Sequence, residues 1–150
     1  MKIQHGKLYL MALLMFFSCK QEKQEIIVEQ AASKFWEYFY NLNYPAAKAL
    51  ATPSSANFFK LLASNVRQEH LDMLHAQPPA GVSVVASSID SNEENALVIC
   101  QISNAFTIDV ITGKAQTTEL LVDTLQLTKE DNEWLIRKDI QQQNGMQSRD

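Results

Sequence analysis

Apolar residues between positions 25 and 42 recur every three or four residues, which is the spacing of one side of an α-helix. Polar residues cover the opposite side of this segment. Trp36 and Tyr40 lie on one flank, between the apolar and the polar side. The pattern predicts an amphipathic helix over residues 25–42. Its buried side carries Val28, Ala31, Ala32, Phe35, Phe39 and Leu42.

Asn43 and Pro45 predict the start of a second helix over residues 45–51, because asparagine is a favoured N-cap and proline suits the first turn. The Thr-Pro-Ser segment at 52–54 then interrupts the chain. A third helix is expected from there to about residue 76.

The third helix contains a conflict between its two halves. Its first half has an apolar side that includes Phe58 and Leu62, but the same side of the second half carries Glu69 and Asp72. Either the helix breaks near Asn65 or a polar stripe faces the interior. We favour the break, because burying two carboxylates without partners costs several kcal/mol.

From residue 82 onwards, apolar and polar residues alternate as in half-buried strands. Strands are predicted over residues 82–89, 96–111, 115–128 and 133–139. Asn104 interrupts the apolar side of the second strand and is expected to mark a bulge. A two-residue loop would pair the second and third strands as a hairpin whose apolar sides coincide. The residues on that shared side are Cys100, Ile102, Phe106, Leu121, Leu125 and Leu127.

Three N-terminal helices followed by four antiparallel strands define an α+β fold, with the helices packed on one face of a curved sheet. With this layout the chain resembles the cone-shaped nuclear-transport-factor-2-like superfamily over about residues 25–140. The resemblance rests on the helices in FWEYFYNLNYPAAKALA, on the long hairpin and on the closing strand in KEDNEWLIRKD. Within the superfamily, the chain is similar to small bacterial lipoproteins of unknown function. Because the superfamily includes isomerases, dehydratases and non-catalytic domains, the resemblance implies a fold and not a reaction.

Residues 1–19 combine two lysines, an apolar run over residues 8–17 and a Ser18-Cys19 junction. The run is shorter than the roughly 20 residues that a membrane-spanning helix needs, and it is typical of a secretory signal. A small residue before cysteine resembles the lipobox of bacterial lipoproteins, with Phe16 at a position where leucine is usual. The resemblance implies cleavage after Ser18 and lipid attachment at Cys19. An ordinary secretory signal or a membrane anchor that ends in cysteine is the alternative.

This interpretation divides the chain into a signal peptide (1–18), a solvated tether (19–24), a cone-shaped domain (25–140) and a polar tail (141–150). The mature protein is expected to be attached to a membrane of the cell envelope through the lipid at Cys19. We expect the outer membrane, facing the periplasm, with exposure on the cell surface as the alternative.

The chain is acidic, with 17 Asp and Glu against 13 Lys and Arg. Two of the lysines leave with the signal peptide, and no basic patch remains. Nucleic acid and anionic lipid surfaces are therefore not expected as partners. If Cys19 is acylated, Cys100 has no partner for a disulfide. Its apolar neighbours in the sequence indicate an ordinary core residue.

No pair of side chains has the spacing that metal binding or acid–base catalysis requires. His70 and His75 lie on different sides of a straight helix. Glu69 and Asp72 share a side without a third ligand and are interpreted as a solvated helix edge. Four glycines in the whole chain argue against a phosphate-binding loop. We therefore expect no metal, no cofactor and no catalytic residue.

Trp36 and Tyr40 are the predicted ligand-binding residues, because each adds a polar tip to an aromatic body beside the buried face. The phenylalanines are interpreted as core. Two functions stay open. The first is a tethered, non-catalytic domain that binds a small apolar ligand, a peptide or another envelope protein. The second is an isomerase- or dehydratase-type enzyme with an acid–base pair inside the cone. The first is favoured, because the sequence nominates no such pair.

Overall fold

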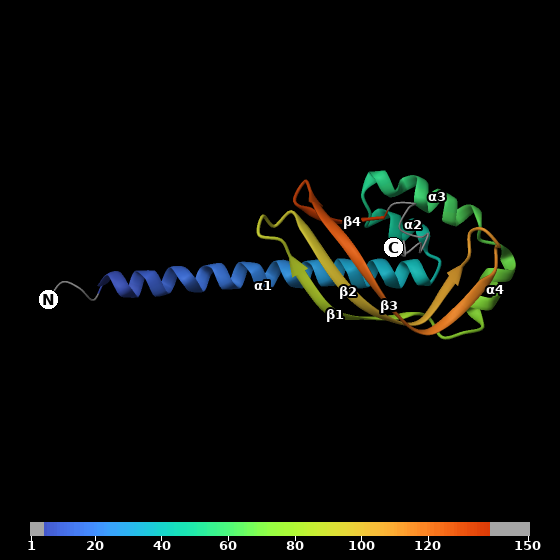
Figure 1. The fold of residues 1–150 in the computed structure, drawn as a ribbon, viewed down its shortest axis with the longest axis horizontal. Coiled ribbons are helices and arrows are strands. Elements are labelled where there is room, and N and C mark those ends of the chain that lie inside the picture. The colour runs from blue at the N-terminus through green and yellow to red at the C-terminus, as the bar shows by residue number, and fades with distance from the viewer. Residues whose placement is uncertain (1–4, 139–150) are drawn as a thin grey trace, which may run out of the picture.

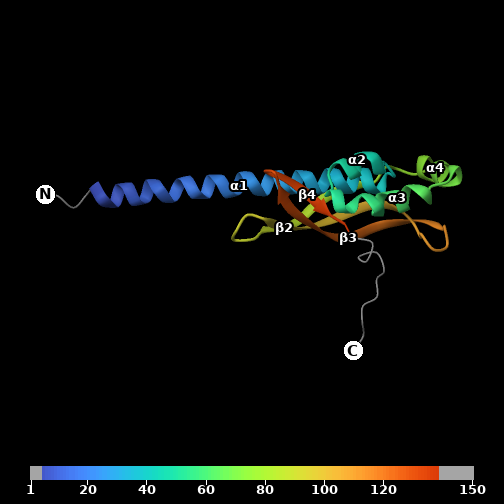
Figure 2. The same cartoon turned by 90° about the horizontal axis from the view of Figure 1, so that it is seen from above.

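The computed structural model describes the backbone of residues 5–138 and the side chains of residues 22–138. The helices are α1 (His5–Tyr40), α2 (Tyr44–Ala49), the 3₁₀ turn η1 (Pro53–Ser55), α3 (Ala56–Ser64) and α4 (Gln68–His75). The strands are β1 (Gly81–Ile89), β2 (Asn95–Ile108), β3 (Ala115–Glu130) and β4 (Glu133–Arg137). They form one antiparallel sheet in the order β1-β2-β3-β4, with the helices on one face (Figures 1 and 2). The expected α+β class with four antiparallel strands is confirmed.

The helical part differs from the expected three helices, because the third one is divided. Helix α3 ends at Ser64, and α4 begins at Gln68. Glu69 and Asp72 are exposed as a result. The break favoured by the sequence is therefore present, and it keeps both carboxylates in water.

The start of α2 follows the local sequence signals. The side chain of Asn43 accepts a hydrogen bond from the backbone N–H of Ala46 at 3.3 Å, and Pro45 lies in the first turn. Both features suit a helix N-terminus, since the first N–H groups of a helix have no partner within it.

Helix α1 begins much earlier than predicted. It runs unbroken from His5, and its N-terminal half projects beyond the sheet (Figure 1). Gln24, which was placed in the solvated tether, accepts a hydrogen bond from Trp134 Nε1 at 3.0 Å. The packed part of the domain therefore begins at Gln24. None of the helices in the described part of the chain is long and apolar enough to cross a membrane.

The long hairpin of β2 and β3 has the predicted sidedness. Leu121 lies opposite Ile102, and Leu125 lies opposite Val98. The connection between the strands spans residues 109–114 and is longer than the two-residue loop expected. The apolar sides still coincide, because residues directly opposite each other in an antiparallel pair share a face.

The expected bulge at Asn104 was wrong. The register between β2 and β3 is the same on both sides of Asn104, so no residue is inserted there. Asn104 instead adopts a left-handed conformation with φ of 53°, which asparagine tolerates better than most residues. The inserted residue is Val85 in β1, where the register with β2 shifts between Val84 and Ala86.

The core forms where the C-terminal half of α1 packs against the sheet and α3. Ring centroids of Phe35, Phe39, Phe58 and Phe59 lie 5.2 to 6.1 Å apart in four pairs, which confirms the phenylalanines of α1 as core. The expected position of Trp36 and Tyr40 between core and solvent was wrong. They are 1% and 3% exposed, because residues of β3 and of the chain after β4 cover that flank of α1.

Candidate functional site

A carboxylate lies on the helix-facing side of the sheet, in the middle of β3. Asp123 shares this side with Leu121 and Leu125, as the alternation of strand residues requires. The hydroxyl of Tyr40 donates a hydrogen bond to Asp123 Oδ2 at 3.2 Å. The two residues are 83 positions apart, and the packing of α1 on the sheet brings them together.

Tyr40 is held in its protonated form. Burial raises the pKa of its hydroxyl, and the negative charge of Asp123 and their hydrogen bond raise it further. A buried phenol of this kind is a hydrogen-bond donor and not a base at neutral pH.

Lys138 brings a positive charge to the same region. It follows β4 directly and continues the inward alternation of Trp134 and Ile136. Its backbone N–H donates a hydrogen bond to Ser55 Oγ at 3.1 Å, which fixes the chain at this point. Its ammonium lies 4.7 Å from the centroid of the Trp36 ring, within the range of a cation–π interaction.

The environment of Lys138 has two opposing effects. Burial lowers the pKa of its ammonium, and the negative charge of Asp123 partly offsets this. The ammonium forms no hydrogen bond or ion pair with any of residues 22–138, so the Trp36 ring is its direct contact there.

The indole N–H of Trp36 is the buried polar group in the described structure that lacks a partner. Its Nε1 is fully buried and finds no acceptor among the described residues. A buried donor without an acceptor costs about 1–3 kcal/mol. The other tryptophan behaves differently, since Trp134 Nε1 donates to Gln24. We call Trp36, Tyr40, Asp123 and Lys138 the interior polar cluster.

Cys100 borders this cluster and is a core residue, as the sequence indicated. It lies opposite Asp123 in the sheet and is fully buried. Burial, followed by the charges of Asp123 and Glu29, raises the pKa of its thiol to about 11. The thiol therefore stays protonated at neutral pH and is a poor nucleophile.

His70 of α4 has a structural role. Nδ1 of the buried His70 accepts a hydrogen bond from the backbone N–H of Arg67, and its Nε2 donates to the carbonyl of Gly113 at 3.1 Å. His70 thereby joins α4 to the tip of the β2–β3 hairpin. His75 and Asp72 are exposed. Among the described residues, no group of three or more His, Cys, Asp and Glu side chains could hold a metal ion.

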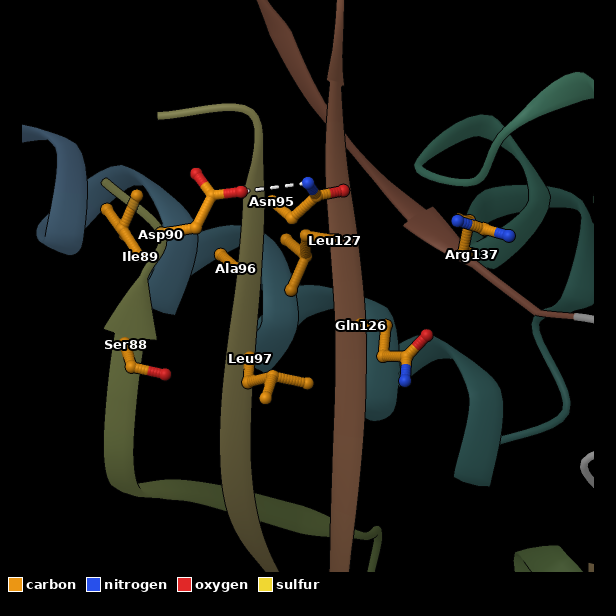
Figure 3. A pocket seen from close by; sticks show the side chains of 9 residues that line it. All are labelled: Ser88, Ile89, Asp90, Asn95, Ala96, Leu97, Gln126, Leu127 and Arg137. Atoms are coloured by element: carbon orange, nitrogen blue, oxygen red, sulfur yellow. Dashed lines mark hydrogen bonds between the residues drawn. The ribbon is translucent and has the colours of Figure 1, made fainter. Parts of the chain in front are cut away.

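A second candidate is a shallow groove of about 380 Å³ on the opposite face of the sheet, seen in Figure 3. Ser88, Leu97, Gln126 and Arg137 form a row across all four strands in its floor. At its rim, Asp90 accepts hydrogen bonds from the Asn95 side chain and the Glu94 backbone, which lower the pKa of this exposed carboxyl. The carboxyl of Asp90 thus already has partners within the chain.

The outer face of the sheet, where this groove lies, also carries exposed apolar side chains. The exposed ones are Val85, Leu97, Ile99, Leu120 and Val122. No described helix covers them, since the helices pack on the other face (Figure 2). The outer face offers an exposed apolar surface, whereas the interior polar cluster contains donors that have no hydrogen-bond partner among residues 22–138. We therefore regard the cluster as the main candidate site.

Sequence reasoning identified Trp36 and Tyr40 and missed Asp123 and Lys138. The available signal was a polar residue at a position where the alternation of a strand calls for an apolar one. Asp123 stands between Leu121 and Leu125 on the predicted apolar side. The predicted lipid-attachment residue Cys19 and the polar tail 141–150 lie outside the residues whose side chains are described.

Comparison with known proteins assigns the chain to no family. No protein-family model matches it, and no curated protein sequence matches it significantly.

Proposed function

We propose that this protein is a lipid-anchored envelope protein whose folded domain binds a partner without catalysis. The observation behind the anchor is the Ser18-Cys19 junction after a short apolar run with a basic start. We place the protein on the outer membrane, facing the periplasm. The order of elements, with helices on one face of a four-stranded antiparallel sheet, supports a cone-shaped, nuclear-transport-factor-2-like domain.

Binding is proposed to involve Trp36 and Tyr40 within the interior polar cluster. The observation that carries this proposal is the buried Trp36 N–H, which has no acceptor among the described residues, next to the ammonium of Lys138, which forms no hydrogen bond or ion pair with residues 22–138. Native structures rarely leave such groups unsatisfied, so a ligand atom or a bound water is expected to complete the site. The half-buried position of Lys138 supports access from the end of β4.

One observation favours the enzymatic alternative. Tyr40 and Asp123 form a hydrogen-bonded acid–base pair on the inward side of the sheet. Such a pair is what an isomerase- or dehydratase-type reaction would require. Against this, Tyr40 and Asp123 are hydrogen-bonded to each other, and the phenol is 3% exposed. Trp36 is buried to the same degree, so a substrate or a ligand reaches this cluster only when the side chains around it move.

A turnover assay distinguishes the non-catalytic binding domain from the enzymatic alternative. The full chain should convert neither a β,γ-unsaturated ketone nor a β-hydroxy acid above the buffer rate. Turnover that Asp123→Asn abolishes, with an unchanged melting temperature, would establish the enzymatic alternative. Asp90→Asn is the matched control, because Asp90 is an exposed carboxyl on the other face of the sheet.

Lipid attachment at Cys19 can be tested by measuring the mass of the mature protein. Intact-mass spectrometry of protein extracted from membranes should show a chain that begins at Cys19 and carries a diacylglyceryl group and an N-acyl group. A chain that begins elsewhere, or at Cys19 without lipid, contradicts the anchor.

A further inference from the structure

The outer face of the sheet combines exposed apolar side chains with an absence of charge. The segments 81–89 of β1, 95–103 of β2 and 120–128 of β3 contain one charged residue, Asp123, which lies on the helix-facing side. All outward side chains of these segments are thus uncharged, in a chain with 17 acidic and 13 basic residues. Exposed apolar residues without charges among them are typical of the centre of a protein interface.

The size of this face suits an interface between two proteins. Nine residues at about 3.3 Å each, on three to four strands spaced about 4.8 Å apart, give a flat area of roughly 30 Å by 15–20 Å. The accessible surface of the side chains is larger than this flat area. It approaches the roughly 800 Å² that each partner buries in a standard interface. The face is therefore large enough for a stable dimer.

Charged groups of opposite sign lie at the two edges of this face (Figure 3). Arg137 is on β4, and Asp90 follows β1 at the other edge, with Leu97 and Gln126 between them. Both charged side chains are exposed. The guanidinium of Arg137 forms no hydrogen bond or ion pair with residues 22–138. Each copy of the chain thus has an anionic and a cationic edge.

A twofold axis along the strands, between β2 and β3, brings these edges together when two such faces meet. It turns the β4 edge of one copy onto the β1 edge of the other. Arg137 is level with Ser88 across the sheet, and Asp90 is two residues, or about 7 Å, further along. The long arginine side chain can cover this offset. Because such an interface is isologous, the contact between arginine and aspartate occurs twice.

The same axis directs both α1 helices to one end of the pair. The N-terminal half of α1 projects past the end of the sheet at which the β1–β2 and β3–β4 turns lie (Figure 1). Near that end, Trp134 donates its hydrogen bond to Gln24 of α1. An axis along the strands leaves this end the same in both copies. Both N-termini can then reach one membrane, as the proposed lipid anchors require.

We propose that the outer face of the sheet binds a second copy of this chain, in a symmetric dimer in which each Arg137 pairs with Asp90 of the other copy. Val122 of β3 lies beside the twofold axis. An uncharged face also avoids the repulsion that two acidic chains otherwise have. The inference goes beyond the proposed function and does not depend on the interior polar cluster.

The test measures the oligomeric state of the mature protein, extracted from membranes into a mild detergent. Sedimentation velocity over a range of protein concentrations should show a dimer once bound detergent is subtracted. Val122→Asp should be a monomer, because it places two carboxylates side by side in an apolar interface. Its circular dichroism spectrum should match that of the wild type, since Val122 is 60% exposed in the single chain.

Charge reversal tests the orientation of the two copies. Arg137→Glu and Asp90→Arg should each weaken dimerisation by about fivefold or more, because each replaces two attractive contacts with two repulsive ones. The variant with both substitutions should recover most of the wild-type affinity, since the pairs are restored with exchanged signs. Lys60→Glu is the matched control, because Lys60 is an exposed cation of α3, on the helix side of the sheet. It should dimerise like the wild type.

Three results would overturn the inference. A wild type that is monomeric at about 100 μM would leave the face to a different partner. A dimer of unchanged affinity in Val122→Asp would use another surface. A double variant as weak as the single ones would reject the proposed axis. If Asp90→Arg fails to fold because the β1–β2 turn loses its hydrogen bonds, Arg137→Glu and Val122→Asp decide. The lipid mass at Cys19 and the turnover assay test the proposed function separately.

Discussion

Replacing Leu125 with aspartate should unfold the domain. Leu125 is fully buried on the helix-facing side of β3, opposite Val98. The variant would lose the apolar contacts of a core leucine and would bury a carboxyl two residues from Asp123, on the same side of the strand. Each effect costs several kcal/mol, and a domain of this size is stable by only about 5–15 kcal/mol. Ile102→Asp should behave alike, since Ile102 is fully buried on β2.

The same substitution on the other side of the same strand is the control. Val122 lies on the outer face of β3 and is 60% exposed. Val122→Asp should therefore change the melting temperature by only a few degrees. Thermal unfolding followed by circular dichroism measures all three variants. Near wild-type melting of Leu125→Asp and Ile102→Asp would mean that the faces of the hairpin are reversed.

Replacing Cys19 with alanine should abolish lipid attachment. The thiol of Cys19 is the proposed acceptor of the diacylglyceryl group, and alanine offers no atom that could take its place. Cells grown with an alkyne fatty acid should show labelled wild-type protein and no labelled variant. The variant should accumulate as an unprocessed precursor that is larger than the mature chain.

Cys100→Ala is the matched control for that experiment. Cys100 is the other cysteine of the chain, and its buried, protonated thiol cannot receive a lipid in the folded domain. Labelling of Cys100→Ala should equal that of the wild type. Persistent labelling of the Cys19→Ala variant would contradict lipid attachment at Cys19. The proposed binding site would not be affected by that result, because it does not depend on the lipid.

The two lysine–tryptophan pairs show how similar local geometry can have different consequences. Lys129 and Lys138 each lie over an indole ring, at 5.5 and 4.7 Å from its centroid. The pairs differ in the indole N–H: that of Trp134 donates to Gln24, whereas that of Trp36 has no acceptor in the part of the chain that the structure describes. The unsatisfied donor, rather than the cation–π contact, distinguishes the proposed site.

Much of the local structure could be predicted from residues close together in the chain. The Asn43 cap, the break after Ser64 and the shared face of Leu121 and Leu125 all appear as expected. Each depends on short-range effects, namely capping, helical periodicity and strand alternation. The start of α1 was missed, because polar residues such as those at 20–24 are compatible with a helix as well as with a tether.

The interior polar cluster could be predicted only in part. Alternation places Asp123 and Lys138 on the inward side of their strands, and the helical pattern places Trp36 and Tyr40 on one flank of α1. Which residues contact that flank depends on how α1 lies across the sheet. Because β3 and the chain after β4 pack against it, Trp36 and Tyr40 are buried and do not border solvent as expected.

The sequence by itself therefore determined the order of helices and strands and most of their apolar sides, because these depend on the order and spacing of neighbouring residues, and lipid attachment at Cys19 stays a prediction from the same kind of local pattern. Only the tertiary structure decided that Tyr40 meets Asp123 and that Lys138 lies over Trp36. These contacts join residues 83 and 102 positions apart, and they form because α1 packs on the sheet and against the chain that follows β4. The unpartnered N–H of Trp36 is likewise a property of the packed molecule, since a donor becomes unsatisfied only when burial removes water and supplies no acceptor.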